Sequence, residues 1–126
     1  MLSRGIYVTE IEIKQKITTL TKKYNTTNPF ELCDYLDITI SKEDLGKLKG
    51  YYYCHNRIKI IVLNNDLNNH MAKEVCAHEL GHAIMHSSLN TMFLCANTSI
   101  VVNKFENEAN LFAKLLIELD QDIHIC

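Results

Sequence analysis

Residues 78–82, which read His-Glu-Leu-Gly-His, constrain the fold of this chain more than any other feature. If residues 68–85 form a helix, His78 and His82 lie one turn apart on the same face, so both imidazoles can reach one metal ion. Glu79 lies about 100° around that helix, too far to be a ligand but close enough to accept a proton from a water molecule at the metal. This spacing is typical of zinc hydrolases.

The motif lies in a segment with the apolar periodicity of a helix. One stripe runs through both histidines and consists of Leu67, Met71, Val75, His78 and His82. Its steps of four, four, three and four residues follow one helix face, so we expect the two histidines to face the core. Hydrogen-bonded core histidines are the alternative, but two imidazoles on adjacent turns beside a glutamate are costly to bury for packing alone. We therefore favour a metal site.

Size and composition favour one domain over residues 1–126. The chain is 47% hydrophobic, which is enough for a single core. Its net charge is −2 without a cluster of Lys and Arg, so we expect no direct binding of nucleic acid. We find neither an apolar run long enough to cross a membrane nor the features of a signal peptide, and we expect a cytoplasmic protein. Five cysteines without a C-x-x-C pair indicate reduced thiols.

Capping residues mark two helices before the motif. Thr9 and Glu12 form a capping box that opens the first, and Asn28 caps a second, short helix that should end near Asp37. The apolar stripe of the first helix consists of Ile13, Ile17, Leu20 and Tyr24.

The remaining pattern predicts an α+β fold with a short, mostly antiparallel sheet. Residues 38–40 read as a strand, and 51–53 with 57–63 read as a hairpin that turns at His55-Asn56 and supplies an edge strand beside the motif helix. The span 87–102 reads as a loop with at most one short strand, and a last helix should run from about 103 to 119.

The third metal ligand must come from elsewhere, because catalytic zinc sites usually have three protein ligands. His86 lies a further turn along the motif helix, where ligands from three successive turns would not easily converge, so we interpret it as a group at the helix end that supports the ligands. On the last helix, Glu106 falls within the apolar arc, whereas Glu108, about 200° away, falls outside it. A capping box of Asn103 with Glu106 is the alternative role for this residue. We favour Glu106 as ligand.

Together these residues resemble the ImmA/IrrE family of metallopeptidases, which belongs among the gluzincins. The resemblance covers most of the chain after residue 28, and the matching segments are 50–63, 78–86 and 106–116. Members often carry a proline after a Leu-Leu pair, whereas Ile117 follows Leu115-Leu116 here. Some relatives also carry a helix-turn-helix segment, which this sequence lacks.

The resemblance implies a small zincin-like domain in which the motif helix packs on the C-terminal helix around one zinc ion, with manganese or cobalt as substitutes. The pattern E-x-x-A-[DN] matches 106–110, which implies Glu106 as third ligand and Asn110 as a residue that holds a ligating histidine.

The family also implies a zinc-dependent endopeptidase, with Glu79 as catalytic base, that cleaves a repressor of the helix-turn-helix type in a bacterial or mobile-element regulatory system. The alternatives are a metal-stabilised module that binds a regulator without cutting it and a toxin-antitoxin component. The donor for the oxyanion stays open among six residues that are suitable by type: Tyr51, Tyr52, Tyr53, His55, His70 and His124.

Overall fold

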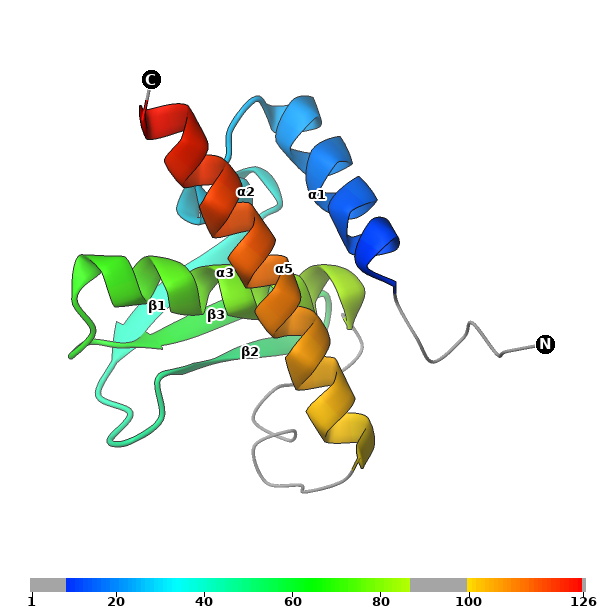
Figure 1. Ribbon diagram of the computed structural model, residues 1–126. Coiled ribbons are helices and arrows are strands. Elements are labelled where there is room, and N and C mark those ends of the chain that lie inside the picture. Colours follow the sequence, from blue (N-terminus) through cyan, green and yellow to red (C-terminus); the bar gives the residue numbers. More distant parts are fainter. Residues whose placement is uncertain (1–8, 87–99, 126) are drawn as a thin grey trace.

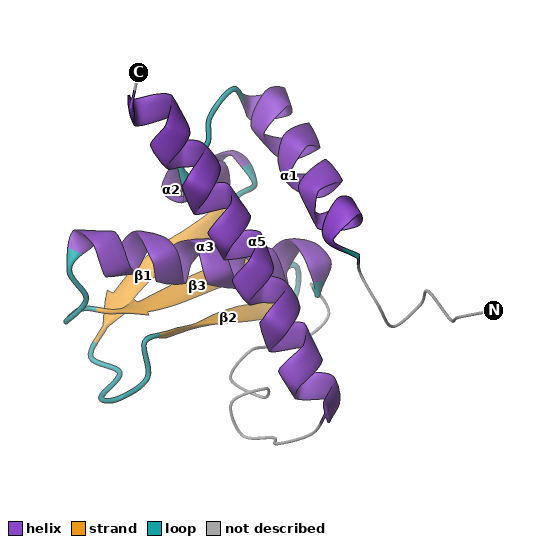
Figure 2. Ribbon diagram, in the orientation of Figure 1, coloured by secondary structure: helices purple, strands orange, loops and turns teal. Residues whose placement is uncertain are grey.

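A computed structural model describes residues 9–86 and 100–125, and within the last helix it describes the side chains of residues 103–121. The elements follow in the order α1 (Glu10–Tyr24), α2 (Pro29–Tyr35), β1 (Ile38–Glu43), β2 (Gly50–His55), β3 (Ile58–Asn64), α3 (Asn69–Met85) and α5 (Ile100–Ile125). The helices pack around a small three-stranded sheet, so the predicted α+β class is confirmed (Figures 1 and 2).

Both N-terminal helices begin at the predicted caps. The Thr9 hydroxyl accepts a hydrogen bond from the backbone N–H of Glu12, and the Glu12 carboxylate accepts one from the backbone N–H of Thr9. The Asn28 side chain accepts a hydrogen bond from the backbone N–H of Phe30 at 2.9 Å. Helix α2 ends slightly earlier than predicted, because Asp37 has a φ of 60° and turns the chain into β1.

The sheet has the order β1-β3-β2, and β2 and β3 form the predicted antiparallel hairpin. Its turn lies at Asn56-Arg57, one residue later than predicted, and both residues have positive φ, as two-residue hairpin turns of type I′ require. Strand β1 pairs with β3 in parallel, so the sheet is mixed rather than mostly antiparallel. The reason is that β3 takes the central position, where its residues 61–64 are buried. Strand β1 therefore pairs with β3, which runs in the same direction, and not with β2, which runs in the opposite direction.

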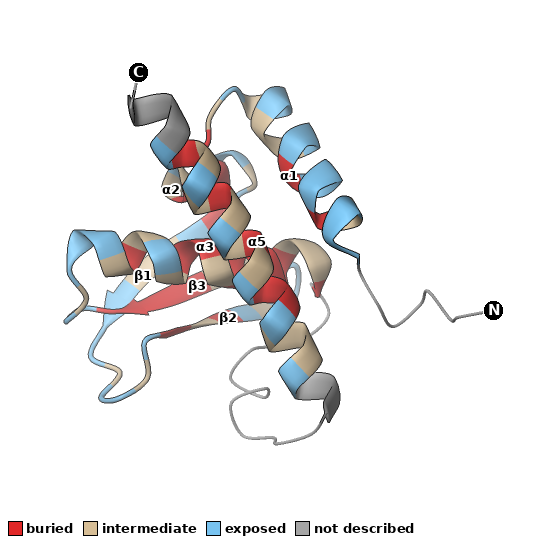
Figure 3. Cartoon of the chain, viewed as in Figure 1, coloured by how far each residue is buried: buried red, intermediate tan, exposed pale blue. Residues whose placement is uncertain are grey.

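Helix α3 covers one face of the sheet, and α5 crosses α3 on the side away from the sheet (Figures 1 and 3). Helix α3 is buried around much of its circumference, because it contacts the sheet, α2 and α5. Its buried apolar residues are Ala72, Cys76, Ala77, Leu80 and Ala83. The predicted core-facing stripe is confirmed in part: His82 is fully buried and Val75 packs against the core, but Val75 and His78 are only half-buried and lie at its border.

Two glycines permit close approaches near the motif. A Cβ atom on Gly81 would lie 3.1 Å from three atoms of the Phe112 side chain, so this glycine lets α5 pack tightly on α3. A Cβ atom on Gly50 would lie 2.7 Å from the carbonyl oxygen of Val62 and 2.9 Å from Val75, so this glycine lets the start of β2 lie against α3. The bare backbone at both positions fixes the spacing of β2, α3 and α5.

Helix α5 is longer than predicted at both ends, and 87–99 of the predicted loop lie outside the described residues. Its buried positions recur at every fourth residue from Glu108 through Phe112 and Leu116 to Asp120. Glu106 lies at the border of this stripe and is half-buried. None of the described helices is long and apolar enough to cross a lipid bilayer.

Candidate metal centre

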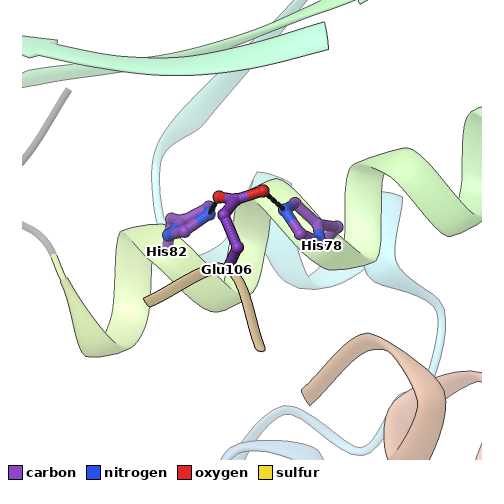
Figure 4. Close-up of side chains that lie close together, drawn as sticks. All are labelled: His78, His82 and Glu106. Carbon is purple, nitrogen blue, oxygen red and sulfur yellow. Dashed lines mark hydrogen bonds and ion pairs between the residues drawn. The ribbon is translucent and has the colours of Figure 1, made fainter. Parts of the chain in front are cut away.

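Two adjacent turns of α3 and one turn of α5 bring three potential metal ligands together. His78, His82 and Glu106 each offer one ligand atom, and these atoms lie within 4.8 Å of one another. The Glu106 carboxylate lies between the two rings: Oε1 is 2.6 Å from Nε2 of His82, and Oε2 is 3.3 Å from Nε2 of His78 (Figure 4). The structure thus brings together the three residues that the sequence predicted as ligands.

The pKa values of the three side chains follow from this contact. Burial lowers the pKa of His78, but its hydrogen bond with Glu106 and the negative charges of Glu79 and Glu106 raise it above its ordinary value. Burial dominates at His82, so the pKa of this histidine lies below its ordinary value despite the bond to Glu106. Hydrogen bonds with the two rings hold the pKa of Glu106 well below its usual range, so the group is a carboxylate at neutral pH.

An open cleft of about 770 Å³ reaches His78 and Glu106. Its walls come from α3, α5 and the segment 47–50 that leads into β2. Glu79 also lines this cleft, although only 6% of its surface is exposed. The sequence predicted that the Glu79 carboxylate lies beside the metal ligands but is not itself a ligand. In the structure Glu79 lines the cleft and does not belong to the three-residue group.

His86 lies behind the centre. Its Nδ1 atom is 3.0 Å from Nδ1 of His82, and its Nε2 atom is 2.7 Å from Oε1 of Glu108. It does not belong to the three-residue group, which agrees with a supporting position. The expectation that Glu108 lies outside the covered face is wrong: the residue is 7% exposed, because α5 packs on α3 over a wider arc than its apolar residues mark. The sequence gives one signal for the contact between His82 and His86, which is their i, i+4 spacing on the same helix face. This spacing does not indicate that the carboxylate of Glu108 contacts His86.

Asn110 lines the cleft one turn after Glu106, and its side chain helps to raise the pKa of His78. This position agrees with the role implied by the resemblance, which stays a prediction. Of the six candidate oxyanion donors, His124 has no described side chain, and His70 alone among the others lines the cleft. His70 lies two turns before His78, about 12 Å along the helix, so it does not reach the ligands. The role of oxyanion donor stays unassigned.

The donor set fits a metal ion of the zinc type. Two imidazole nitrogens and one carboxylate are a ligand set of catalytic zinc sites, which leave a further position for water. The half-exposed Glu106 and the adjoining cleft would give water and substrate access to such a position. His82, in contrast, is fully buried, as suits a ligand that is held in one orientation.

Fold and donor set together define a metallopeptidase-like protein. The family model for the IrrE N-terminal-like domain matches residues 33–123, and the chain belongs to this ImmA/IrrE family of metallopeptidases. It is 41% identical to the uncharacterized immunity region protein 2 of Bacillus phage phi105 over 116 residues, which are 91% of this chain and 72% of that protein. It is 34% identical to metallopeptidase ImmA of Bacillus subtilis strain 168 over 109 residues, which are 86% of this chain and 64% of that protein.

Proposed function

We propose that this protein is a zinc-dependent endopeptidase that cleaves a transcriptional repressor of the helix-turn-helix type and so relieves repression. In this proposal His78, His82 and Glu106 bind one zinc ion, and Glu79 is the catalytic base. The observation that carries it is the convergence of the three ligand atoms within 4.8 Å at a cleft that Glu79 also lines.

A zinc ion bound there would supply a Lewis acid that polarises the peptide carbonyl and makes water more acidic. Glu79 would accept the proton of the attacking water at a carboxylate oxygen and return it to the nitrogen of the leaving amine. Its position supports this role, because Glu79 lines the cleft and its negative charge acts on His78. Asn110, which lines the same cleft and helps to raise the pKa of His78, would hold the His78 ring in one orientation.

The cleft suits an extended segment of protein. Its volume lies within the range of about 300–1,000 Å³ that is usual for ligand sites. Strand β2 is an edge strand among the described strands, and its first residue, Gly50, lines the cleft. A substrate segment could therefore pair its backbone with β2 while its scissile bond lies at His78 and Glu106.

A regulatory substrate is supported by the family and by the names of the two relatives. One relative is named as an immunity region protein of a phage and the other as a metallopeptidase. The two names together fit a protease that acts in a bacterial or mobile-element regulatory system. The chain would work in the cytoplasm and would contact a repressor protein rather than DNA.

Two variants of the full chain test the proposal. Glu79→Gln should keep the zinc content of the purified protein, measured by elemental analysis, but should lose cleavage of helix-turn-helix repressors that are encoded near the gene and co-expressed with it. Glu106→Ala should lose zinc. The control Glu43→Gln, which matches Glu79→Gln but lies at an exposed strand end, should keep both the zinc content and the cleavage. If Glu79→Gln relieves repression as well as the wild type does, the protein acts by binding, and the proteolytic proposal fails.

A further inference from the structure

Glu108 is buried against His86, does not line the cleft and has no role in the proposed function. We propose that Glu108 and His86 form a buried relay that fixes the tautomer and orientation of His82, so that Nε2 of His82 always presents its lone pair to the metal. This inference rests on the proposed function, because it concerns one of the three ligands named there.

The relay consists of three side chains in series. The His82 and His86 rings meet through their Nδ1 atoms at 3.0 Å, and the Nε2 atom of His86 lies 2.7 Å from Oε1 of Glu108. His82 lies in the last turn of α3, His86 is the C-cap of that helix, and Glu108 lies on α5. The contact between His86 and Glu108 therefore forms only when α5 is docked on α3.

Burial makes these contacts difficult to replace by water. His82 is 0% exposed, His86 6% and Glu108 7%. The Phe105 ring also covers His86, with 4.5 Å between the ring centroids. A buried polar group that loses its hydrogen-bond partner destabilises the fold, so each member of the relay holds the next one in place.

The distances allow one arrangement of protons when His82 binds a metal. A neutral imidazole that binds through Nε2 carries its proton on Nδ1, so His82 must donate to Nδ1 of His86. That bond requires a lone pair on Nδ1 of His86, which places the His86 proton on Nε2. From Nε2 this proton is donated to Glu108, whose carboxylate can only accept.

The carboxylate of Glu108, at one end of the relay, thus decides the tautomer of His82 at the other end. In many zinc sites a carboxylate accepts a hydrogen bond directly from a ligating histidine. Here the imidazole of His86 lies between the ligating His82 and the carboxylate of Glu108. Glu108 lies on α5, the helix that also carries Glu106. The same docked helix would then supply one ligand and orient another. Glu108 is in this sense a positioning residue.

The first test needs no substitution. In the zinc-loaded full chain, two-bond proton–nitrogen NMR correlations of the imidazole rings should place the proton of His82 on Nδ1 and that of His86 on Nε2. A proton on Nδ1 of His86 overturns the relay. If the wild-type chain does not bind zinc at all, the proposed function fails and the relay fails with it. Zinc binding with the wrong tautomer defeats the relay alone.

The second test measures zinc affinity by competition with a chelator. Glu108→Leu removes the acceptor and should weaken zinc binding about 10–100-fold, as is typical when a partner of a ligating histidine is lost. Glu108→Gln should keep most of the affinity, because its amide oxygen can accept the same hydrogen bond from His86. The matched control Glu43→Leu lies on an exposed strand end and should bind zinc like the wild type.

A role for Glu108 in packing alone makes the opposite prediction. A leucine of similar size would then bind zinc within about twofold of the wild type, and this result overturns the relay. Visible absorption of the cobalt-loaded protein provides a further comparison, since the relay predicts an altered spectrum for Glu108→Leu and not for Glu108→Gln. If Glu108→Leu does not fold, the tautomers of the wild-type protein decide the question.

Discussion

Asp120 is expected to be one of the residues on which the stability of this fold depends most. It is 3% exposed near the end of α5, accepts a hydrogen bond from the Thr27 hydroxyl at 2.6 Å and forms an ion pair with Lys73. Thr27 lies between α1 and α2, and Lys73 lies on α3. One carboxylate therefore links α5 to two other parts of the molecule, and Asp120→Ala removes both links.

The cost can be estimated from the partners that remain. The buried Thr27 hydroxyl loses its acceptor, which costs about 1–3 kcal/mol. An unpaired charge from a fully buried ion pair costs about 3–5 kcal/mol, but the Lys73 side chain is 28% exposed and can turn partly to water, so its share is smaller. We expect Asp120→Ala to lower the free energy of unfolding by about 3–4 kcal/mol, a large part of the 5–15 kcal/mol of a typical domain.

Urea unfolding of the metal-free protein, followed by circular dichroism, measures this change. In a double-mutant cycle of Lys73→Met and Asp120→Leu, the double variant should lose less stability than the two single variants added together, because it leaves no unpaired charge. Glu43→Ala is the surface control. If Asp120→Ala lowers the free energy of unfolding by less than about 1 kcal/mol, or if the two single effects simply add, this link does not hold α5 in place.

Three further predictions concern the surroundings of the centre. Protons compete with zinc for His78, whose pKa lies above its ordinary value, so zinc affinity should already fall as the pH drops towards about 6.5; a flat pH profile would contradict this. Gly81→Ala should destabilise the fold by about 1–2 kcal/mol in a thermal melt despite the better helix propensity of alanine, because the new methyl group meets the fully buried Phe112; higher stability would refute the tight packing. Cys33 and Cys76, both fully buried with 3.8 Å between their sulfur atoms, should react with a thiol reagent only after unfolding, and rapid labelling of the native protein would show that they are accessible.

The sequence predicted those parts of the fold that depend on neighbouring residues. The capping box at Thr9 and the cap at Asn28 lie within three residues of their partners, so their hydrogen bonds can be read from local spacing. The convergence of His78, His82 and Glu106 was also predicted, because helix periodicity places the two histidines on one face and the pattern E-x-x-A-[DN] singles out Glu106, although the apolar arc misjudged the relative burial of Glu106 and Glu108. That these residues bind metal stays a prediction.

The sequence did not predict features that depend on tertiary contacts. The parallel pairing of β1 depends on which strand of the hairpin takes the central position, and both strands are rich in β-forming residues. Glu108 was misplaced for a similar reason: its helical angle is correct, but the width of the covered arc depends on how closely α3 approaches. That approach requires Gly81, whose missing side chain gives no periodic signal.

The three candidate ligands are divided between α3 and α5, so the complete ligand set exists only when the two helices are folded and docked. His82 and Glu106 lie 24 residues apart in the sequence, and an unfolded chain would have to close that loop before all three side chains could bind one metal ion. If a cation binds there as we propose, the free energy of its binding would stabilise mainly the native state. Metal supply would then govern how long the protein survives as well as whether it is active, and a cell that starves it of zinc would leave it more open to degradation.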